Sequence, residues 1–140
     1  MKTFQAVKAW IENEKGELLF LKEKTPSGKD YYSLPGGRVN EGETEEKALE
    51  REVNEETGLD VAVGKHLGEY HFTMESGDVV EAEVFKCEIT GGSVTKEFQD
   101  SLQEEIVSFH WISPKEFIEK NLTSSGLDFN RFLEGITSGK

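Results

Sequence analysis

Residues 37–59 read GRVNEGETEEKALEREVNEETGL, and this stretch decides both the expected fold and the expected chemistry. Thr44 is a residue type that caps helices, and the glutamates that follow it suit the positive end of a helix dipole. Gly58 supplies the C-terminal stop. The stretch therefore predicts a helix that runs from Thr44 to Gly58.

Three glutamates of this helix fall on one side. At 3.6 residues per turn, Glu52, Glu55 and Glu56 share an arc of about 100°. Like charges three and four residues apart repel, so this crowding opposes helix stability unless a cation lies there. Carboxylate oxygens suit Mg²⁺ or Mn²⁺, and Arg51 is able to hold a carboxylate by two parallel hydrogen bonds. The alternative is an acidic face that is simply solvated.

The whole stretch resembles the Nudix box, GX5EX7REUXEEXGU with U aliphatic, and every specified position matches. The preceding Leu34-Pro35-Gly36-Gly37 resembles the LPGG segment of the same family. The resemblance implies an α/β fold class, with an α/β/α sandwich, a central mixed β-sheet and about three helices. We expect residues 1–140 to form a single domain of this kind.

The resemblance also implies roles for individual residues. The implied metal ligands are Glu52, Glu55 and Glu56, with Mg²⁺ as the cofactor and Mn²⁺ as a substitute. The orienting, supporting and turn-forming residues are Arg51, Glu43, Gly37 and Gly58. The catalytic base varies within the family: Glu56 or Glu55 is our first choice, and Glu105, with Glu104 beside it, is the second. The alternative for the last two is solvation in a loop.

Three residues outside the helix are candidates for substrate binding. Lys22 ends an apolar run where similar proteins place a basic residue against phosphate; the alternative is an exposed lysine. Tyr32, like Tyr31, could stack on a base or merely pack. Arg38 lies in the loop of the box, and an ordinary loop residue is its alternative.

The remaining segments predict strands and short helices. Strands are expected at residues 4–11, 18–21, 31–34, 61–73, 79–89 and 105–112, from β-branched and aromatic content between turn residues. The first two are expected to pair as a hairpin across the turn at residues 13–16, and residues 75–78 indicate another hairpin. Gly36 and Gly37 predict a turn or a close backbone approach. Short helices are expected from Ser113-Pro114 and at 127–132.

Composition excludes several classes of partner. The chain has 140 residues and a formal net charge of −12, with no basic run, so we expect neither a nucleic acid polymer nor an anionic membrane as partner. The single cysteine excludes an intramolecular disulfide and a cysteine-based zinc site. No long apolar segment and no leader-like start are seen, so we expect a cytoplasmic protein. A second copy of the chain is an open alternative as partner.

The expected substrate is a small nucleoside diphosphate derivative. The resemblance implies a metal-dependent hydrolase of the diphosphate linkage, and we expect a MutT-like pyrophosphohydrolase that converts NTP or dNTP to NMP and pyrophosphate. The open alternatives are hydrolysis of ADP-ribose, a nucleotide sugar or a dinucleoside polyphosphate. A non-catalytic nucleotide-binding module is the alternative from another class.

Overall fold

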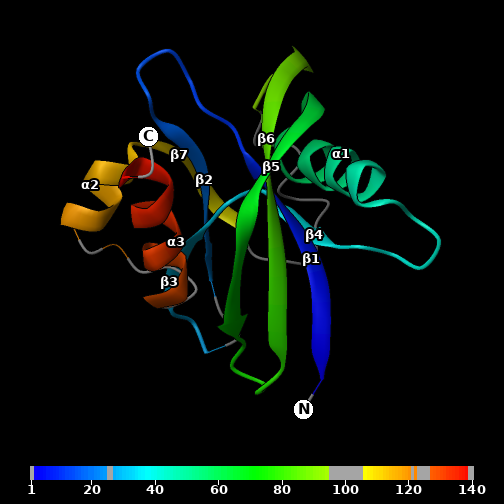
Figure 1. Ribbon diagram of the computed structural model, residues 1–140, viewed down its shortest axis with the longest axis vertical. Coiled ribbons are helices and arrows are strands. Elements are labelled where there is room, and N and C mark those ends of the chain that lie inside the picture. The colour runs from blue at the N-terminus through cyan, green and yellow to red at the C-terminus, as the bar shows by residue number, and fades with distance from the viewer. Residues whose placement is uncertain (1, 25–26, 95–105, 121, 123–126, 139–140) are drawn as a thin grey trace.

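The computed structural model describes residues 2–24, 27–94, 106–120, 122 and 127–138 (Figure 1). Its elements in chain order are β1 (Thr3–Trp10), β2 (Leu18–Lys24), β3 (Asp30–Ser33), β4 (Gly36–Arg38), α1 (Glu45–Thr57), β5 (Leu59–Thr73), β6 (Val79–Gly92), β7 (Ile106–Ile112), α2 (Pro114–Glu119) and α3 (Leu127–Ser138). This order confirms the predicted α/β class.

The central mixed sheet has the strand order β4-β1-β6-β5. β1 pairs in parallel with β6, from Thr3 opposite Val79 to Trp10 opposite Lys86. β4 lies antiparallel on the other side of β1, and β5 lies antiparallel to β6. The β5–β6 pair is the hairpin that the turn at residues 75–78 predicts.

A second sheet stands beside the first, with the order β3-β2-β7 and antiparallel pairing throughout. The register of β2 against β7 shifts between Lys22 and Glu23. Such a bulge bends a strand and changes where its side chains point. The link from β3 to β4 carries the chain from this sheet to the mixed sheet.

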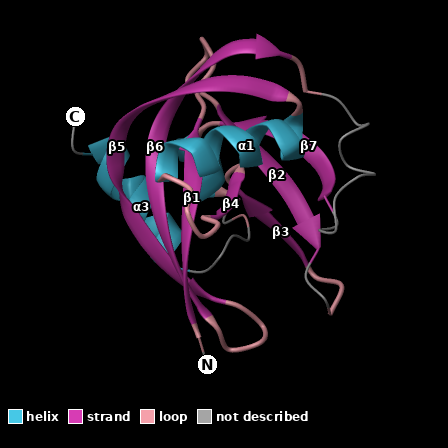
Figure 2. Cartoon of the chain, turned by 90° about the vertical axis from the view of Figure 1, so that its right-hand side faces the viewer, coloured by secondary structure: helices cyan, strands magenta, loops and turns pink. Residues whose placement is uncertain are grey.

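Helices cover the sheets from two sides, as Figures 1 and 2 show. On the α1 side, the buried cluster consists of Val7, Ala9, Ile11, Leu19, Ala48, Leu49, Val53, Leu59, Val61 and Cys87. On the side of α2 and α3, it consists of Trp10, Leu18, Phe20, Leu34, Tyr70, Ala82, Val84, Ile112, Phe117, Phe129 and Leu133. The two clusters confirm the expected layers of helix, sheet and helix.

The predicted hairpin between residues 4–11 and 18–21 is wrong. The turn itself forms, because the Asn13 side chain accepts hydrogen bonds from two backbone N–H groups within it. Beyond a single bridge between Glu12 and Leu18, however, the two strands separate and join different sheets. Residues 6–10 of β1 and 18–21 of β2 are all buried, so both faces are covered there. A local pattern specifies neither the covering layer nor the sheet partner.

Helix α1 begins and ends where its caps predict. The Oγ1 of Thr44 accepts a hydrogen bond from the Lys47 N–H at 3.1 Å. Gly58 takes a left-handed conformation with φ +86°, and its N–H donates to the Asn54 carbonyl. The apolar side of the helix packs on the mixed sheet, and Glu52 and Glu56 lie next to that side, where they meet β4.

The later elements also follow their sequence signals. Ser113 caps α2, with Pro114 in its first turn. α3 continues past the expected end at residue 132 as far as Ser138. In the described part of the chain, none of the helices has the length and apolar character needed to cross a bilayer.

Gly36 shows the close backbone approach that its sequence context predicts. It has φ +145°, and a Cβ built on it would lie 1.9 Å from the carbonyl oxygen of Val7. Gly36 is also the first residue of β4, a short strand that the sequence pattern does not predict. A side chain at this position would push β4 away from β1.

We predict that Gly36→Ala lowers the free energy of unfolding by more than about 2 kcal/mol, because an impossible contact adds to an unfavourable φ. Urea unfolding measures the change. The matched control is Gly135→Ala in α3, where a Cβ has open space and a gain of roughly 0.5–1 kcal/mol is expected. A Gly36→Ala protein as stable as the parent would contradict the packing described.

Candidate active site

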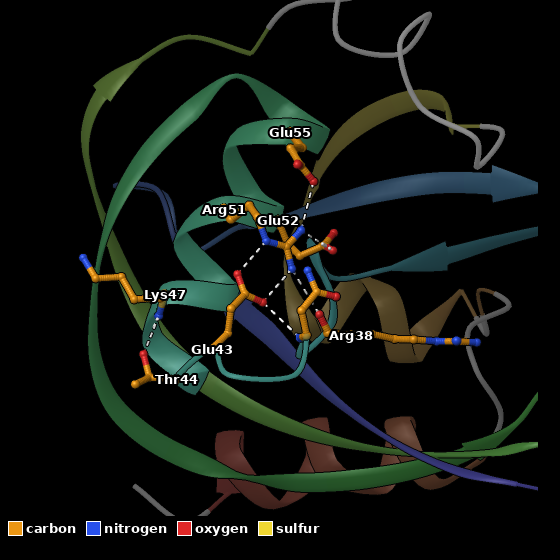
Figure 3. A network of polar contacts seen from close by, with 8 residues as sticks. Arg38, Glu43, Thr44, Lys47, Arg51, Glu52 and Glu55 are labelled. Carbon is orange, nitrogen blue, oxygen red and sulfur yellow. Dashed lines mark hydrogen bonds and ion pairs between the residues drawn. The ribbon is translucent and has the colours of Figure 1, made fainter.

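Arg51 of α1 is the hub of a polar network at the acidic side of the helix (Figure 3). Its Nε and Nη2 donate to the two carboxylate oxygens of Glu43 at 2.8 and 3.0 Å. Its Nη1 donates to Glu52 at 3.0 Å and to Glu55 at 3.1 Å, and Nη2 also reaches the Arg38 carbonyl at 3.3 Å. One guanidinium thus joins the loop after β4 to two carboxylates of the helix.

The contact with Arg51 has a clear electrostatic consequence for Glu43. Hydrogen bonds from Arg51 and then from the Asn40 N–H lower the pKa of Glu43 to about 2. The same contact raises the pKa of Arg51. Because hydrogen bonds to a carboxylate favour its charged form, Glu43 is an anion throughout the neutral range and ties the loop after β4 to Arg51 of the helix.

Glu52 lies directly against the backbone of Gly37. A Cβ at position 37 would lie 2.5–2.8 Å from the three carboxyl atoms of Glu52. The Glu52 side chain is 16% exposed and contacts Arg51 from the other side. Gly37 therefore makes room for a carboxylate, which is a more specific role than the turn-forming one that the resemblance implies.

Glu56 is buried, with 3% of its surface exposed. Its Oε1 accepts a hydrogen bond from the Gly36 N–H at 2.7 Å. Burial raises the pKa of Glu56 well above 4.5; the charge of Lys8 opposes this rise, and the like charge of Glu23 adds to it. The two adjacent glycines thus contact one helix carboxylate each, Gly36 through its N–H and Gly37 through its missing side chain.

Two charged residues beside Glu56 were not identified from the sequence. Lys8 and Glu23 are 8% and 7% exposed, and both interact electrostatically with Glu56. A charged residue in or directly after an apolar strand is a signal of burial with a partner, because unpaired charges are seldom buried. That signal was available at both positions.

The three predicted metal ligands do not surround one point. Glu52 and Glu55 both contact Arg51, the Glu55 side chain is 49% exposed, and Glu56 turns inward to Gly36. The described residues contain no group of three His, Cys, Asp or Glu side chains placed to hold one ion. The oxygen donors suit a hard divalent cation, and Glu52 is near enough to Glu56 to raise its pKa. The donor types therefore fit such an ion, but the three side chains do not converge on one point. Ligation by this trio stays a prediction.

Two of the three substrate-binding candidates lie in the second sheet, on β2 and β3. The Nζ of Lys22 lies 3.6 Å from the Oδ2 of Asp30 on the neighbouring strand. Tyr32 packs edge-on against Phe20 and against Phe117 of α2, so packing is the role that these contacts show.

Arg38 is the third substrate-binding candidate, and Glu105 is the second candidate for the catalytic base. The guanidinium of Arg38 lies 3.7 Å from the centre of the Phe4 ring, and it points away from the Arg51 network in Figure 3. Cation–π contact on an exposed strand end accounts for that placement. Glu105, with Glu104 beside it, lies outside the described residues.

We predict that Glu43→Gln lowers the melting temperature at pH 7, and that the difference from the parent shrinks as the pH falls. The pKa of Glu43 is lower in the folded protein than its ordinary 4.5, so its stabilising effect is present above 4.5 and lost as pH falls to about 2. Thermal unfolding between about pH 5 and pH 2.5 measures the trend. Glu41→Gln, in the same loop and exposed, is the control; a pH-independent effect of Glu43→Gln would contradict the prediction.

Comparison with known proteins identifies the family. The sequence matches the NUDIX domain family over residues 2–131. An ADP-ribose pyrophosphatase of Methanocaldococcus jannaschii is 32% identical over 132 residues, which cover 93% of this chain and 75% of the relative. A CTP pyrophosphohydrolase of Escherichia coli (strain K12) is 26% identical, with 91% and 88% covered.

Solved structures with a similar fold point to the same family. The crystal structure of a MutT protein from Methanosarcina mazei Go1 superposes with a TM-score of 0.79 at 27% identity, covering 99% of this chain and 95% of that one. Some relatives are longer: the chain spans 30% of one from Caenorhabditis elegans and 62% of one from Bacillus subtilis (strain 168). With a family match over residues 2–131 and a matching fold, the chain belongs to the Nudix family.

Proposed function

We propose that the chain is a metal-dependent hydrolase that cleaves the diphosphate linkage of nucleoside diphosphate derivatives. The observation that carries the proposal is the pairing of Gly36 with Glu56 and of Gly37 with Glu52. This pairing fixes two carboxylates of one helix at the start of the loop that Arg51 and Glu43 anchor. A solvated acidic face would need none of these contacts.

In this proposal, Mg²⁺ or Mn²⁺ is held by Glu52, Glu55 and Glu56. When bound, the ion would neutralise the diphosphate charge and lower the pKa of a coordinated water. Glu55 is exposed and contacts Arg51, so metal binding would compete with that ion pair. Arg51 would continue to orient the remaining carboxylates from the loop side.

The proton of the attacking water needs an acceptor within hydrogen-bond reach. Glu56 is our first candidate, because the Gly36 N–H holds one of its oxygens and burial isolates it from bulk solvent. Glu55 remains the alternative on the same helix, and Glu105 remains the second choice beyond it. The general base is therefore a proposal that variants must decide.

We propose an NTP or dNTP as substrate, with NMP and pyrophosphate as products. Support comes from the name of the E. coli relative, of which the chain covers 88%, and from the MutT structure that it matches nearly end to end. The sequence has no proline between Pro35 and Pro114, where ADP-ribose hydrolases tend to have one. Tyr70, the nearest tyrosine to the position typical of dinucleoside polyphosphate hydrolases, is buried in the core.

ADP-ribose is the second candidate, and one observation favours it. The M. jannaschii relative that is named for this substrate has the higher identity, 32% against 26% for the E. coli relative. A panel of canonical and oxidised dNTPs, ADP-ribose, nucleotide sugars and dinucleoside polyphosphates with Mg²⁺ separates the candidates. Product masses in ¹⁸O-labelled water locate the phosphorus that is attacked. The cytoplasmic location and a homodimer stay predictions.

We predict that Glu56→Gln lowers kcat by about 10²-fold or more, because either ligation or proton transfer is lost, while the fold remains. Steady-state turnover with the best substrate of the panel and far-ultraviolet circular dichroism measure the two effects. The control is Glu46→Gln, an exposed residue of the first turn of α1, which should stay within about twofold of the parent. Unchanged turnover in Glu56→Gln would refute the assignment.

We predict that Gly37→Ala weakens Mn²⁺ binding and lowers turnover by about tenfold or more while changing the melting temperature little. The new methyl group meets the end of the Glu52 side chain, which can move aside at small cost to protein stability. The site, however, requires the Glu52 carboxylate in its present position. Calorimetric titration with Mn²⁺ and a thermal melt measure the two outcomes. Normal metal affinity in this variant would show that Glu52 is not positioned by Gly37.

A further inference from the structure

Lys8 is a buried cation that the proposed reaction does not use. It lies on β1 opposite Gly36 of β4, in the middle of the mixed sheet. With 8% of its surface exposed, it is the only buried lysine or arginine among the residues that the structure describes. Burying an ammonium group is costly unless hydrogen bonds and an opposite charge compensate.

The hydrogen bonds of Lys8 go to the link between the two sheets. Its Nζ donates to the Oγ of Ser33 at 3.1 Å and to the carbonyl of Leu34 at 3.3 Å. Ala9, the next residue of β1, donates its N–H to the Pro35 carbonyl at 2.8 Å. β1 therefore holds three consecutive residues, namely the last residue of β3 and the two residues of the link, Leu34 and Pro35. They come just before Gly36, whose N–H binds Glu56.

The charge of Lys8 acts on the buried carboxyl group of Glu56, which also feels the like charge of Glu23. Glu56 and Glu23 are both nearly inaccessible, and Lys8 is the favourable partner of Glu56. Without the ammonium group, the effect of Glu23 on Glu56 would have no opposing charge from position 8. A neutral side chain at position 8 would therefore remove both the restraint on the link and the counter-charge.

We infer that Lys8 is a positioning residue for the active site: by binding Ser33 and Leu34, it fixes the link whose Gly36 N–H holds Glu56. The inference rests on the proposed function, in which Glu56 is a ligand or base. Lys8 acts through the link and through charge, and it does not itself contact the reacting atoms. Its loss should affect the chemical step and the metal more than binding of the nucleotide.

The first test compares Lys8→Met with Lys65→Met, which removes an exposed lysine of β5. We expect Lys8→Met to lower kcat by about tenfold or more and to weaken Mn²⁺ binding, with KM changed by less than about threefold. Lys65→Met should keep kcat, KM and Mn²⁺ affinity within about twofold of the parent. If the parent turns over a substrate and Lys8→Met does so equally well, the inference is wrong and the proposed function stands.

The second test does not depend on turnover. Melting temperatures are measured for Lys8→Met, Glu56→Gln, the double variant and the parent, because such a cycle isolates the interaction between the two residues. We expect the drop caused by Lys8→Met to be at least about halved in the Glu56→Gln background, where one of the buried anions is gone. Additive drops would overturn the inference even if no substrate is found.

A third variant keeps the test valid if Lys8→Met does not fold. Ser33→Ala removes one hydrogen-bond partner of Lys8 and leaves every charge in place. We expect a folded protein whose kcat falls by roughly threefold to tenfold with little change in KM. If the parent protein neither turns over a substrate nor binds Mn²⁺, the proposed function is wrong. If Ser33→Ala has the kcat and Mn²⁺ affinity of an active parent, only the role of the link is wrong.

Discussion

The site depends on how closely the backbone at Gly36 and Gly37 approaches its surroundings. Gly36 touches the Val7 carbonyl on β1 and holds Glu56 through its N–H, and Gly37 leaves the space that the Glu52 carboxylate fills. Sheet, loop and helix therefore meet within two residues that have no side chains. Because the carboxylates are placed by backbone contact, their positions follow directly from the pairing of β4 with β1.

Electrostatic balance at the site is achieved with few cations. The chain carries a net charge of −12, and the acidic side of α1 concentrates part of it. Arg51 pairs with the outer carboxylates, and Lys8 of β1 acts on the buried carboxyl group of Glu56. The two cations lie at different depths, so they divide the glutamates into a solvent-facing set and an inner set. A bound dication would add the third positive centre that this arrangement lacks.

The features that could be predicted from the sequence are those that local chemistry determines. The limits of α1 follow from Thr44 and Gly58, and the contact of Arg51 with a carboxylate follows from its planar fork. The separation of β1 from β2 could not be predicted, because a turn specifies direction and not the sheet that each strand joins. The burial of Lys8 depends in the same way on contacts with residues that are distant in sequence.

The parallel pairing of β1 with β6 also constrains how the chain reaches this fold. Thr3 pairs with Val79, which lies 76 positions further along the chain, so β1 finds this neighbour only after a long stretch of further sequence has been synthesised. Until then, the edge of β1 that β6 will cover is open, whereas the other edge can already pair with β4. Contacts between residues so far apart slow folding, and an open strand edge can pair with other chains until its own neighbour arrives.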